Sequence, residues 1–139
     1  MSSRESPTDW QRIEVAGPTA LGDAVASARR YALDKELGPS DCARLCIIVE
    51  ELLTNLLEHG GLTHPQIAVE FDRFDGAIRL IIEDNGSPFD PRSAIPDNAI
   101  PDRGGNAGLR LVQSWSEIMS YESSGGQNRL ELLLELGGS

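Results

Sequence analysis

Three polar side chains, Glu51, Asn55 and His59, recur at every fourth position near the end of the longest helix that the sequence predicts. Residues four apart on a helix lie only about 40° round from each other, so the three form one polar column. The other faces carry mostly leucine, isoleucine and valine, among which a polar group costs free energy unless something satisfies it. An asparagine oxygen is a suitable Mg²⁺ ligand, and a carboxylate one turn away could orient or deprotonate a hydroxyl that attacks a phosphoryl group. The column is therefore a candidate site for a metal-bound phosphate.

These residues also have simpler interpretations. Glu and Asn at this spacing are common on exposed helix faces, and for an isolated pair that interpretation is usually right. Their apolar neighbours favour the site instead. His59 could equally complement the dipole at the C-terminal end of the helix, and for this residue the two interpretations stay open.

A second candidate segment, Asp84-Asn85-Gly86-Ser87-Pro88-Phe89-Asp90-Pro91, follows a predicted strand. Asn-Gly after a strand is by itself a hairpin signal. The residues after it do not alternate, however, and proline cannot supply the donors of a sheet ladder. We therefore expect the strand to end in a loop, where a carboxylate can accept from an exocyclic amine such as adenine N6. Gly86 would let a flat ring approach the backbone closely.

The third candidate is the glycine-rich stretch Arg103-Gly104-Gly105-Asn106-Ala107-Gly108-Leu109, which leads into a predicted helix. Glycines before a helix expose backbone amides at the positive end of its dipole, where a phosphate can bind. A flexible linker would look similar, so the loop alone is weak evidence. The sequence contains neither Gly-x-x-x-x-Gly-Lys-Ser/Thr nor a Gly-x-Gly-x-x-Gly after its first strand, which excludes the two common nucleotide-binding loops.

The elements that must position these segments follow from apolar periodicity and turn residues. In order, the sequence predicts a strand, two helices, two strands, a proline-bearing loop, a helix and two strands, at 10–16, 19–36, 40–58, 66–74, 77–83, 84–105, 107–115, 118–122 and 130–136. This order predicts an α+β fold, a two-layer sandwich whose helices cover one face of a mixed, mostly antiparallel sheet. We expect a flexible N-terminus at 1–8, a single domain at 9–136 and a tail at 137–139.

The net charge of −10, from 12 basic and 22 acidic residues, repels nucleic acid and anionic lipid, and no basic patch offsets it. No apolar run approaches the ~18 residues of a membrane span, and residues 1–9 carry no signal-peptide pattern, so we expect a cytoplasmic protein. Cys42 and Cys46 are expected to be small core residues rather than a redox or metal pair.

In order and spacing, the three segments resemble the N, G1 and G2 boxes of the GHKL ATPase superfamily, which includes gyrase, heat-shock chaperones and histidine kinases. The run Asp-Asn-Gly-Ser-Pro-Phe-Asp-Pro and the ending Gly108-Leu-Arg-Leu-Val…Tyr121…Asn128-Arg-Leu are most similar to the small anti-sigma-factor serine/threonine kinases. The resemblance covers Trp10 to Leu136. It implies a histidine-kinase-like, Bergerat-type ATP-binding fold with an ATP lid at about 87–105.

The resemblance also implies roles for single residues. Glu51 matches the general base, Asn55 the Mg²⁺ ligand, and Asp84 the residue that reads adenine. Gly105 and Gly108 match the phosphate-loop glycines. The candidate nucleotide-binding residues are Asn55, His59, Asp84, Gly86, Phe89, Gly104, Gly105, Asn106, Gly108, Leu109 and Asn128.

Two positions depart from the family pattern. Asn106 stands where the phosphate loop usually has its second glycine, although asparagine tolerates left-handed backbone better than most residues. Asn128 or Arg129 stands where a hydroxyl residue is common on the last strand, and Asn128 could still form a hydrogen bond.

The function implied by the resemblance is an ATP- and Mg²⁺-dependent serine/threonine kinase that acts as an anti-sigma factor. Its partners would be a sigma factor and a small STAS-type antagonist that it phosphorylates, with no direct contact to nucleic acid or membrane. Members of the family are often dimers, so a homodimer is also expected. The alternative is a partner switch of the same fold that transfers no phosphate; Glu51 favours the kinase and Asn106 the switch. A sensor histidine kinase does not fit, because neither of the two histidines, His59 and His64, lies on a separate dimerising hairpin.

Overall fold

The computed structural model describes residues 10–59, 64–88, 90–91 and 105–137, and gives only the backbone of His59, Phe74 and 105–109. Within that part the elements are β1 (Trp10–Ala16), a 3₁₀ turn (Gly17–Thr19), α1 (Ala20–Asp34), α2 (Pro39–His59), β2 (Gln66–Phe74), β3 (Ala77–Asp84), α3 (Gly105–Trp115), β4 (Ser116–Ser124) and β5 (Gln127–Glu135). None of the described helices is long and apolar enough to cross a membrane.

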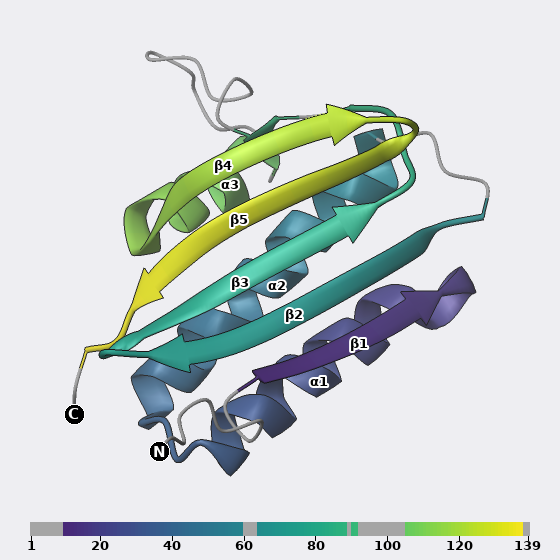
Figure 1. The fold of residues 1–139 in the computed structure, drawn as a ribbon. Helices are drawn as coiled ribbons and strands as arrows, with labels where there is room; N and C mark the ends of the chain where they lie inside the picture. The colour runs from purple at the N-terminus through teal and green to yellow at the C-terminus, as the bar shows by residue number, and fades with distance from the viewer. Residues whose placement is uncertain (1–9, 60–63, 89, 92–104, 138–139) are drawn as a thin grey trace, which may run out of the picture.

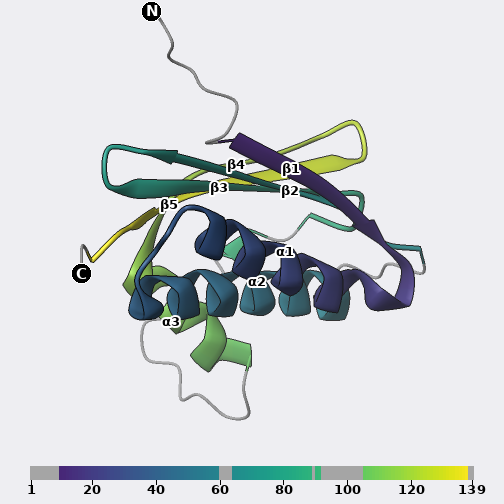
Figure 2. The same cartoon turned by 90° about the horizontal axis from the view of Figure 1, so that it is seen from below.

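The five described strands form one sheet in the order β1-β2-β3-β5-β4 (Figure 1). The three helices lie on one side of it, with α1 and α2 against the sheet and α3 beside α2 (Figure 2). This arrangement confirms the predicted α+β two-layer fold. Every neighbouring pair in the described sheet is antiparallel, so the sheet is antiparallel throughout rather than mixed.

Two tight hairpins set the register of the sheet. Asp75 and Gly76 join β2 to β3 with φ of 50° and 78°, and Gly125 and Gly126 join β4 to β5 with φ of 60° and 80°. Two consecutive positive φ angles define the hairpin turn whose twist matches that of the flanking strands, and Asp-Gly and Gly-Gly tolerate them. As a consequence Asp84, at the end of β3, lies opposite Asn128 on β5.

The two faces of the sheet differ in chemistry. The face away from the helices carries ion pairs between neighbouring strands, including Arg12 with Glu70 at 2.7 Å and Arg79 with Asp72 at 2.8 Å. The other face packs against the helices and forms the core, in which Tyr31 of α1 stacks on Phe71 of β2 with ring centroids 5.0 Å apart. Any ligand site between helices and sheet therefore has apolar walls.

Helix α1 buries a narrower face than its sequence suggests. The fully buried residues include Ala24, Ala28 and Ala32, whose small side chains let the helix pack closely, whereas Leu33 is 64% exposed. Leu33 follows the apolar spacing of the helix in the sequence, but it lies outside the buried face. Leu33 is about 100° round the helix from Ala32, which takes it beyond the edge of the alanine stripe.

A buried carboxylate ties the start of α2 to the end of the sheet. Asp41, which is 5% exposed, accepts hydrogen bonds from the Gly137 amide at both oxygens, at 2.9 and 3.1 Å. Arg44 adds an ion pair to the same carboxylate at 3.8 Å. Gly137 belongs to the segment that the sequence suggests as a tail.

The two cysteines lie in or beside the core, as expected. Cys46 is buried and Cys42 is partly buried. Burial raises the pKa of the Cys46 thiol, with a smaller contribution from Cys42.

Candidate functional site

Helix α2 supplies Glu51 and Asn55 from adjacent turns. Asn55 is 3% exposed, and its Nδ2 donates to the backbone carbonyl of Glu51 at 2.7 Å. No hydrogen bond to the Asn55 Oδ1 is found among the residues that the structure describes. The side-chain nitrogen is therefore committed to the helix, and the oxygen is the atom that Asn55 can offer to a ligand.

The Glu51 carboxyl is partly buried, and burial raises its pKa above the ordinary value. The neighbouring charges of Glu50 and Glu58 raise the pKa further. A carboxylate in such surroundings holds a proton more readily than one in water, which suits a group that must accept a proton during a reaction.

The Oδ1 of Asn55 is a suitable ligand atom for Mg²⁺. In the described part of the chain no cluster of three or more His, Cys, Asp or Glu side chains is suited to a metal. Mg²⁺ usually keeps several waters and takes one or two protein oxygens together with substrate phosphates, rather than an all-protein cage. The uncommitted Oδ1 of Asn55 fits that pattern, and phosphates and water would supply the other ligands.

At the end of β3 lies a hydrogen-bonded cluster around Asp84. Asp84 and Asn128 are 3% and 2% exposed. The Asp84 Oδ1 accepts from the Gly86 amide at 2.8 Å and from the Asn128 Nδ2 at 2.9 Å, and the same Nδ2 also donates to the Gly86 carbonyl at 2.8 Å. The Ser123 hydroxyl donates to the Asn128 Oδ1 at 2.6 Å. No described residue donates to the second oxygen of Asp84.

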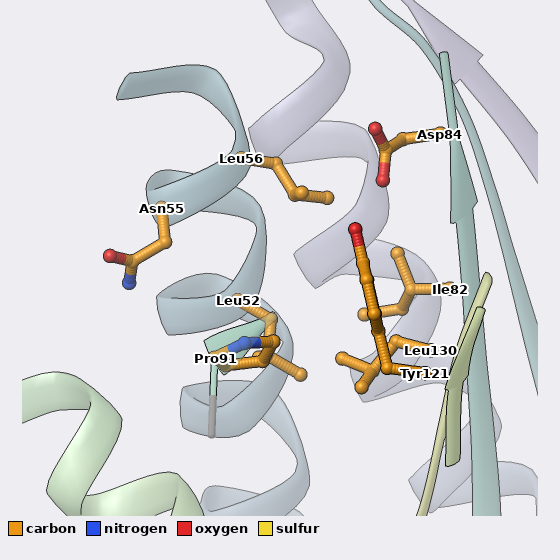
Figure 3. A pocket seen from close by; sticks show the side chains of 8 residues that line it. All are labelled: Leu52, Asn55, Leu56, Ile82, Asp84, Pro91, Tyr121 and Leu130. Carbon is orange, nitrogen blue, oxygen red and sulfur yellow. The ribbon is translucent and has the colours of Figure 1, made fainter. Parts of the chain in front are cut away.

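A narrow cavity of about 20 Å³ separates α2 from the sheet at this point. Its described lining consists of Leu52, Asn55, Leu56, Ile82, Asp84, Pro91, Tyr121 and Leu130 (Figure 3). Asp84 faces the space from β3, and Tyr121 stands between α2 and β3 with its hydroxyl directed toward Asp84 (Figure 3). An apolar slot with an acceptor at its end suits a flat aromatic ring that carries an amine. The present volume holds about one water molecule, so a ring can enter only if lining side chains move.

The structure describes the remaining predicted site residues only in part. Phe89, Gly104 and most of the suggested lid, at 92–104, lie outside the described residues. His59 is the last residue of α2, described by its backbone alone. Helix α3 begins at Gly105, so Gly105, Asn106, Gly108 and Leu109 belong to its first turns rather than to a loop before it. The amides at its N-terminus keep the character of a phosphate-binding end.

Tyr121 is not among the site residues predicted from the sequence, and strict alternation along β4 would place it on the opposite face from Ile118. A β-bulge between Ile118 and Ser120 shifts the register by one residue. Tyr121 therefore joins Ile118 on the helix side, opposite Leu130. Ser123, on the same side of β4, was missed with it. A local bulge leaves no clear signal in one sequence.

Comparison with known proteins places these observations in a family context. A model of the histidine kinase-like ATPase domain matches residues 15–134. The serine/threonine-protein kinase BtrW of Bordetella bronchiseptica is 29% identical over 136 residues, which cover 91% of this chain and 93% of that protein. The histidine kinase domain of the blue-light activated histidine kinase from Erythrobacter litoralis EL346 is 18% identical, with a TM-score of 0.49. That match covers 85% of this chain but only 60% of the solved chain.

Proposed function

The chain belongs to the histidine kinase-like ATPase (GHKL) family, and from that premise we propose that it binds ATP with Mg²⁺ and phosphorylates a serine or threonine of a partner protein. The observation that carries the proposal is that one cavity is lined by two residues, each with an oxygen that no described residue engages. Asn55 offers its Oδ1 from α2, and Asp84 offers its second oxygen from β3. One suits a metal-bound phosphate and the other an amine-bearing ring, which are the two ends of ATP.

At the base end, the slot between Leu52 and Ile82 holds adenine by apolar contact, and Asp84 accepts the hydrogen bond from N6. At the phosphate end, Asn55 would hold Mg²⁺, which would supply positive charge to offset the negative charge of the phosphates. The N-terminus of α3, which packs against α2, supplies backbone amides to the phosphates. These contacts offset the repulsion that a chain of net charge −10 exerts on a nucleotide.

Glu51 is the general base in this proposal. It accepts the proton of the serine or threonine hydroxyl while that oxygen forms a bond to the γ-phosphorus. The bond from the γ-phosphorus to the bridging oxygen breaks, and ADP leaves. Support comes from its position one turn from Asn55 and from its raised pKa, which makes it a stronger base than an exposed carboxylate.

The protein partners follow from the family resemblance and from the similarity to BtrW, which is named a serine/threonine-protein kinase. We propose that the acceptor is a small STAS-type antagonist and that the chain sequesters a sigma factor, as an anti-sigma kinase does. The alternative is a partner switch of the same fold without phosphoryl transfer. It is favoured by Asn106 at a position where the family has glycine.

A pull-down from the native cell, with and without ATP, identifies the acceptor and separates these functions. The kinase predicts that a bound protein gains one phosphate on a serine or threonine when Mg²⁺ and ATP are added, as mass spectrometry of the purified pair would show. ATP-dependent exchange of partners without phosphate on any of them would favour the switch. Calorimetry that finds no ATP binding would contradict the kinase and favour a switch that works without nucleotide.

A further inference from the structure

We propose that Asn128 is a positioning residue that sets base selectivity by holding Asp84, without touching the nucleotide itself. The proposal rests on the proposed ATP site and deepens it. It assigns Asn128 a different task from a hydroxyl residue that contacts the base directly. The cluster of Asp84, Gly86, Ser123 and Asn128 carries the argument, because its hydrogen bonds leave Asn128 no donor for a ligand.

The orientation of the Asn128 amide follows from its neighbours. Asp84 Oδ1 and the Gly86 carbonyl lie 2.9 and 2.8 Å from the same side-chain atom. Both are acceptors, so that atom must be the NH₂ group, and each of its two hydrogens is used. The carbonyl end of the amide accepts from the Ser123 hydroxyl at 2.6 Å. The whole side chain is 2% exposed and engaged at both ends.

These hydrogen bonds determine which oxygen of Asp84 can accept a hydrogen bond from a bound base. Its Oδ1 accepts two N–H groups, from Asn128 and from the Gly86 amide, which sets the plane of the carboxylate. The Asp84 carboxyl group faces the cavity (Figure 3), and its other oxygen, which has no donor among the described residues, is the acceptor that it can offer to a ligand. An acceptor in that place pairs with the 6-amino group of adenine and meets the lone pairs of a 6-oxo purine unfavourably.

Removing the Asn128 side chain would take a hydrogen-bond donor from Asp84 and from the Gly86 carbonyl. Asp84 would keep one of its two donors and could rotate, and the partly buried Gly86 carbonyl would lose the donor supplied by Nδ2. Discrimination between 6-amino and 6-oxo bases should therefore fall, while contacts to sugar and phosphates persist. A role confined to folding would lower stability without changing this ratio.

The test compares the dissociation constants of ATP and inosine triphosphate (ITP), which differ at the 6-position, by calorimetry with Mg²⁺. The parent should prefer ATP, and Asn128→Ala should lower that preference by roughly tenfold, the effect expected for a lost hydrogen bond to a charged group. Asn128→Thr retains one donor and should lie between the two; it also serves if the alanine variant does not fold. Gln127→Ala, the neighbouring exposed residue on the other face of β5, is the matched control and should keep the parent's ratio.

A double-mutant cycle separates positioning from direct contact. On an Asp84→Ala background, Asn128→Ala should cause no further loss of ATP affinity, because a residue that acts through Asp84 has nothing left to position. A parent-like ATP/ITP ratio in both Asn128 variants would overturn the inference while leaving the ATP site intact. Additive losses in the cycle would also overturn it, in favour of direct contact with the base. Absence of ATP binding by the parent would instead remove the proposed function together with the inference.

Discussion

The side-chain nitrogen of Asn55 donates to the backbone carbonyl of Glu51, one turn earlier on α2, at 2.7 Å. This bond joins the two residues of the proposed phosphate end. It also decides which atom of the Asn55 amide faces outward, because the nitrogen must face the carbonyl and the oxygen must face away. The identity of the residue as asparagine, and not simply its polarity, therefore matters.

Asn55→Ala should remove the Mg²⁺-dependent part of ATP binding. Loss of an outer-shell partner alone typically costs roughly 10- to 100-fold in metal affinity, so loss of a ligand should cost at least as much. Asn55→Asp should also weaken binding, although a carboxylate is a good Mg²⁺ ligand, because one of its oxygens would face the Glu51 carbonyl without a hydrogen between them. Calorimetry with Mg²⁺ and with EDTA measures both effects. Unchanged Mg²⁺-dependent affinity in Asn55→Ala would remove Asn55 from the site.

Asp84→Asn should reverse the base preference rather than merely weaken binding. The oxygen of the new side-chain amide can take the place of the Asp84 Oδ1 and accept from Gly86 and Asn128, which directs the new NH₂ group to the cavity. A donor there opposes the 6-amino group of ATP and pairs with the 6-oxo group of ITP. We expect the ATP/ITP affinity ratio to fall by roughly 100-fold or more, in line with sites built around one substrate hydrogen bond. A variant that keeps the parent's ratio would show that Asp84 does not read the base.

Glu51→Gln should stabilise the protein at neutral pH. Burial, and then Glu50 and Glu58, raise the pKa of Glu51, so the folded state binds its proton more tightly than the unfolded state does. The resulting penalty is absent below the ordinary carboxyl pKa, grows as the pH rises toward the raised value, and is fully present above it. Removing the charge should therefore raise the free energy of unfolding at pH 7, a gain that disappears near pH 4. Urea denaturation at both pH values measures it.

The exposed Glu135, at the end of β5, provides the control for that comparison. Glu135→Gln should change stability little at either pH. If Glu51→Gln is no more stable than the parent at pH 7, the negative charge of Glu51 does not lower the free energy of unfolding.

Asp41→Ala should destabilise the fold by about 1–3 kcal/mol, because it leaves the Gly137 amide without its buried acceptor. Asp23→Ala is the matched control, since Asp23 is also an acidic residue in the first turn of a helix but is exposed on α1. Both variants lose the interaction with the helix dipole. The difference between them therefore compares the contacts of Asp41 with Gly137 and Arg44 with the exposed hydrogen bond from Thr19 to Asp23. Thermal denaturation compares the two. Equal losses would mean that the contacts of Asp41 with Gly137 and Arg44 stabilise the fold no more than the exposed contact of Asp23 does.

The sequence predicts most of this fold because its signals are local. Alternation in Trp10–Ala16 and the Asp75-Gly76 turn give β1, β2 and β3 almost to the residue. The polar column on α2 marks Asn55 for the same reason, since four-residue spacing needs no knowledge of the rest of the chain. Leu33 shows the limit, because the width of the buried face of α1 depends on what packs against it.

The less predictable features depend on contacts between distant residues. The β-bulge at Met119 decides that Tyr121 lines the cavity, and only the register with β5 reveals it. Asn128 could be named as a candidate from its place in the sequence, but its bonds to Asp84 and Gly86 join residues 44 and 42 positions apart. The bond from Gly137 to Asp41 spans 96 positions and has no sequence signature.

The most direct test of the kinase proposal is the rate of phosphoryl transfer from ATP to the identified acceptor by the parent and by Glu51→Ala, with the ATP dissociation constant of each measured alongside. If Glu51 is the general base, the variant keeps ATP binding and loses roughly 10²–10⁴-fold in transfer rate. Equal transfer by the two proteins would contradict the assignment of Glu51. No serine or threonine phosphorylation by the parent, despite normal ATP binding, would contradict the kinase itself.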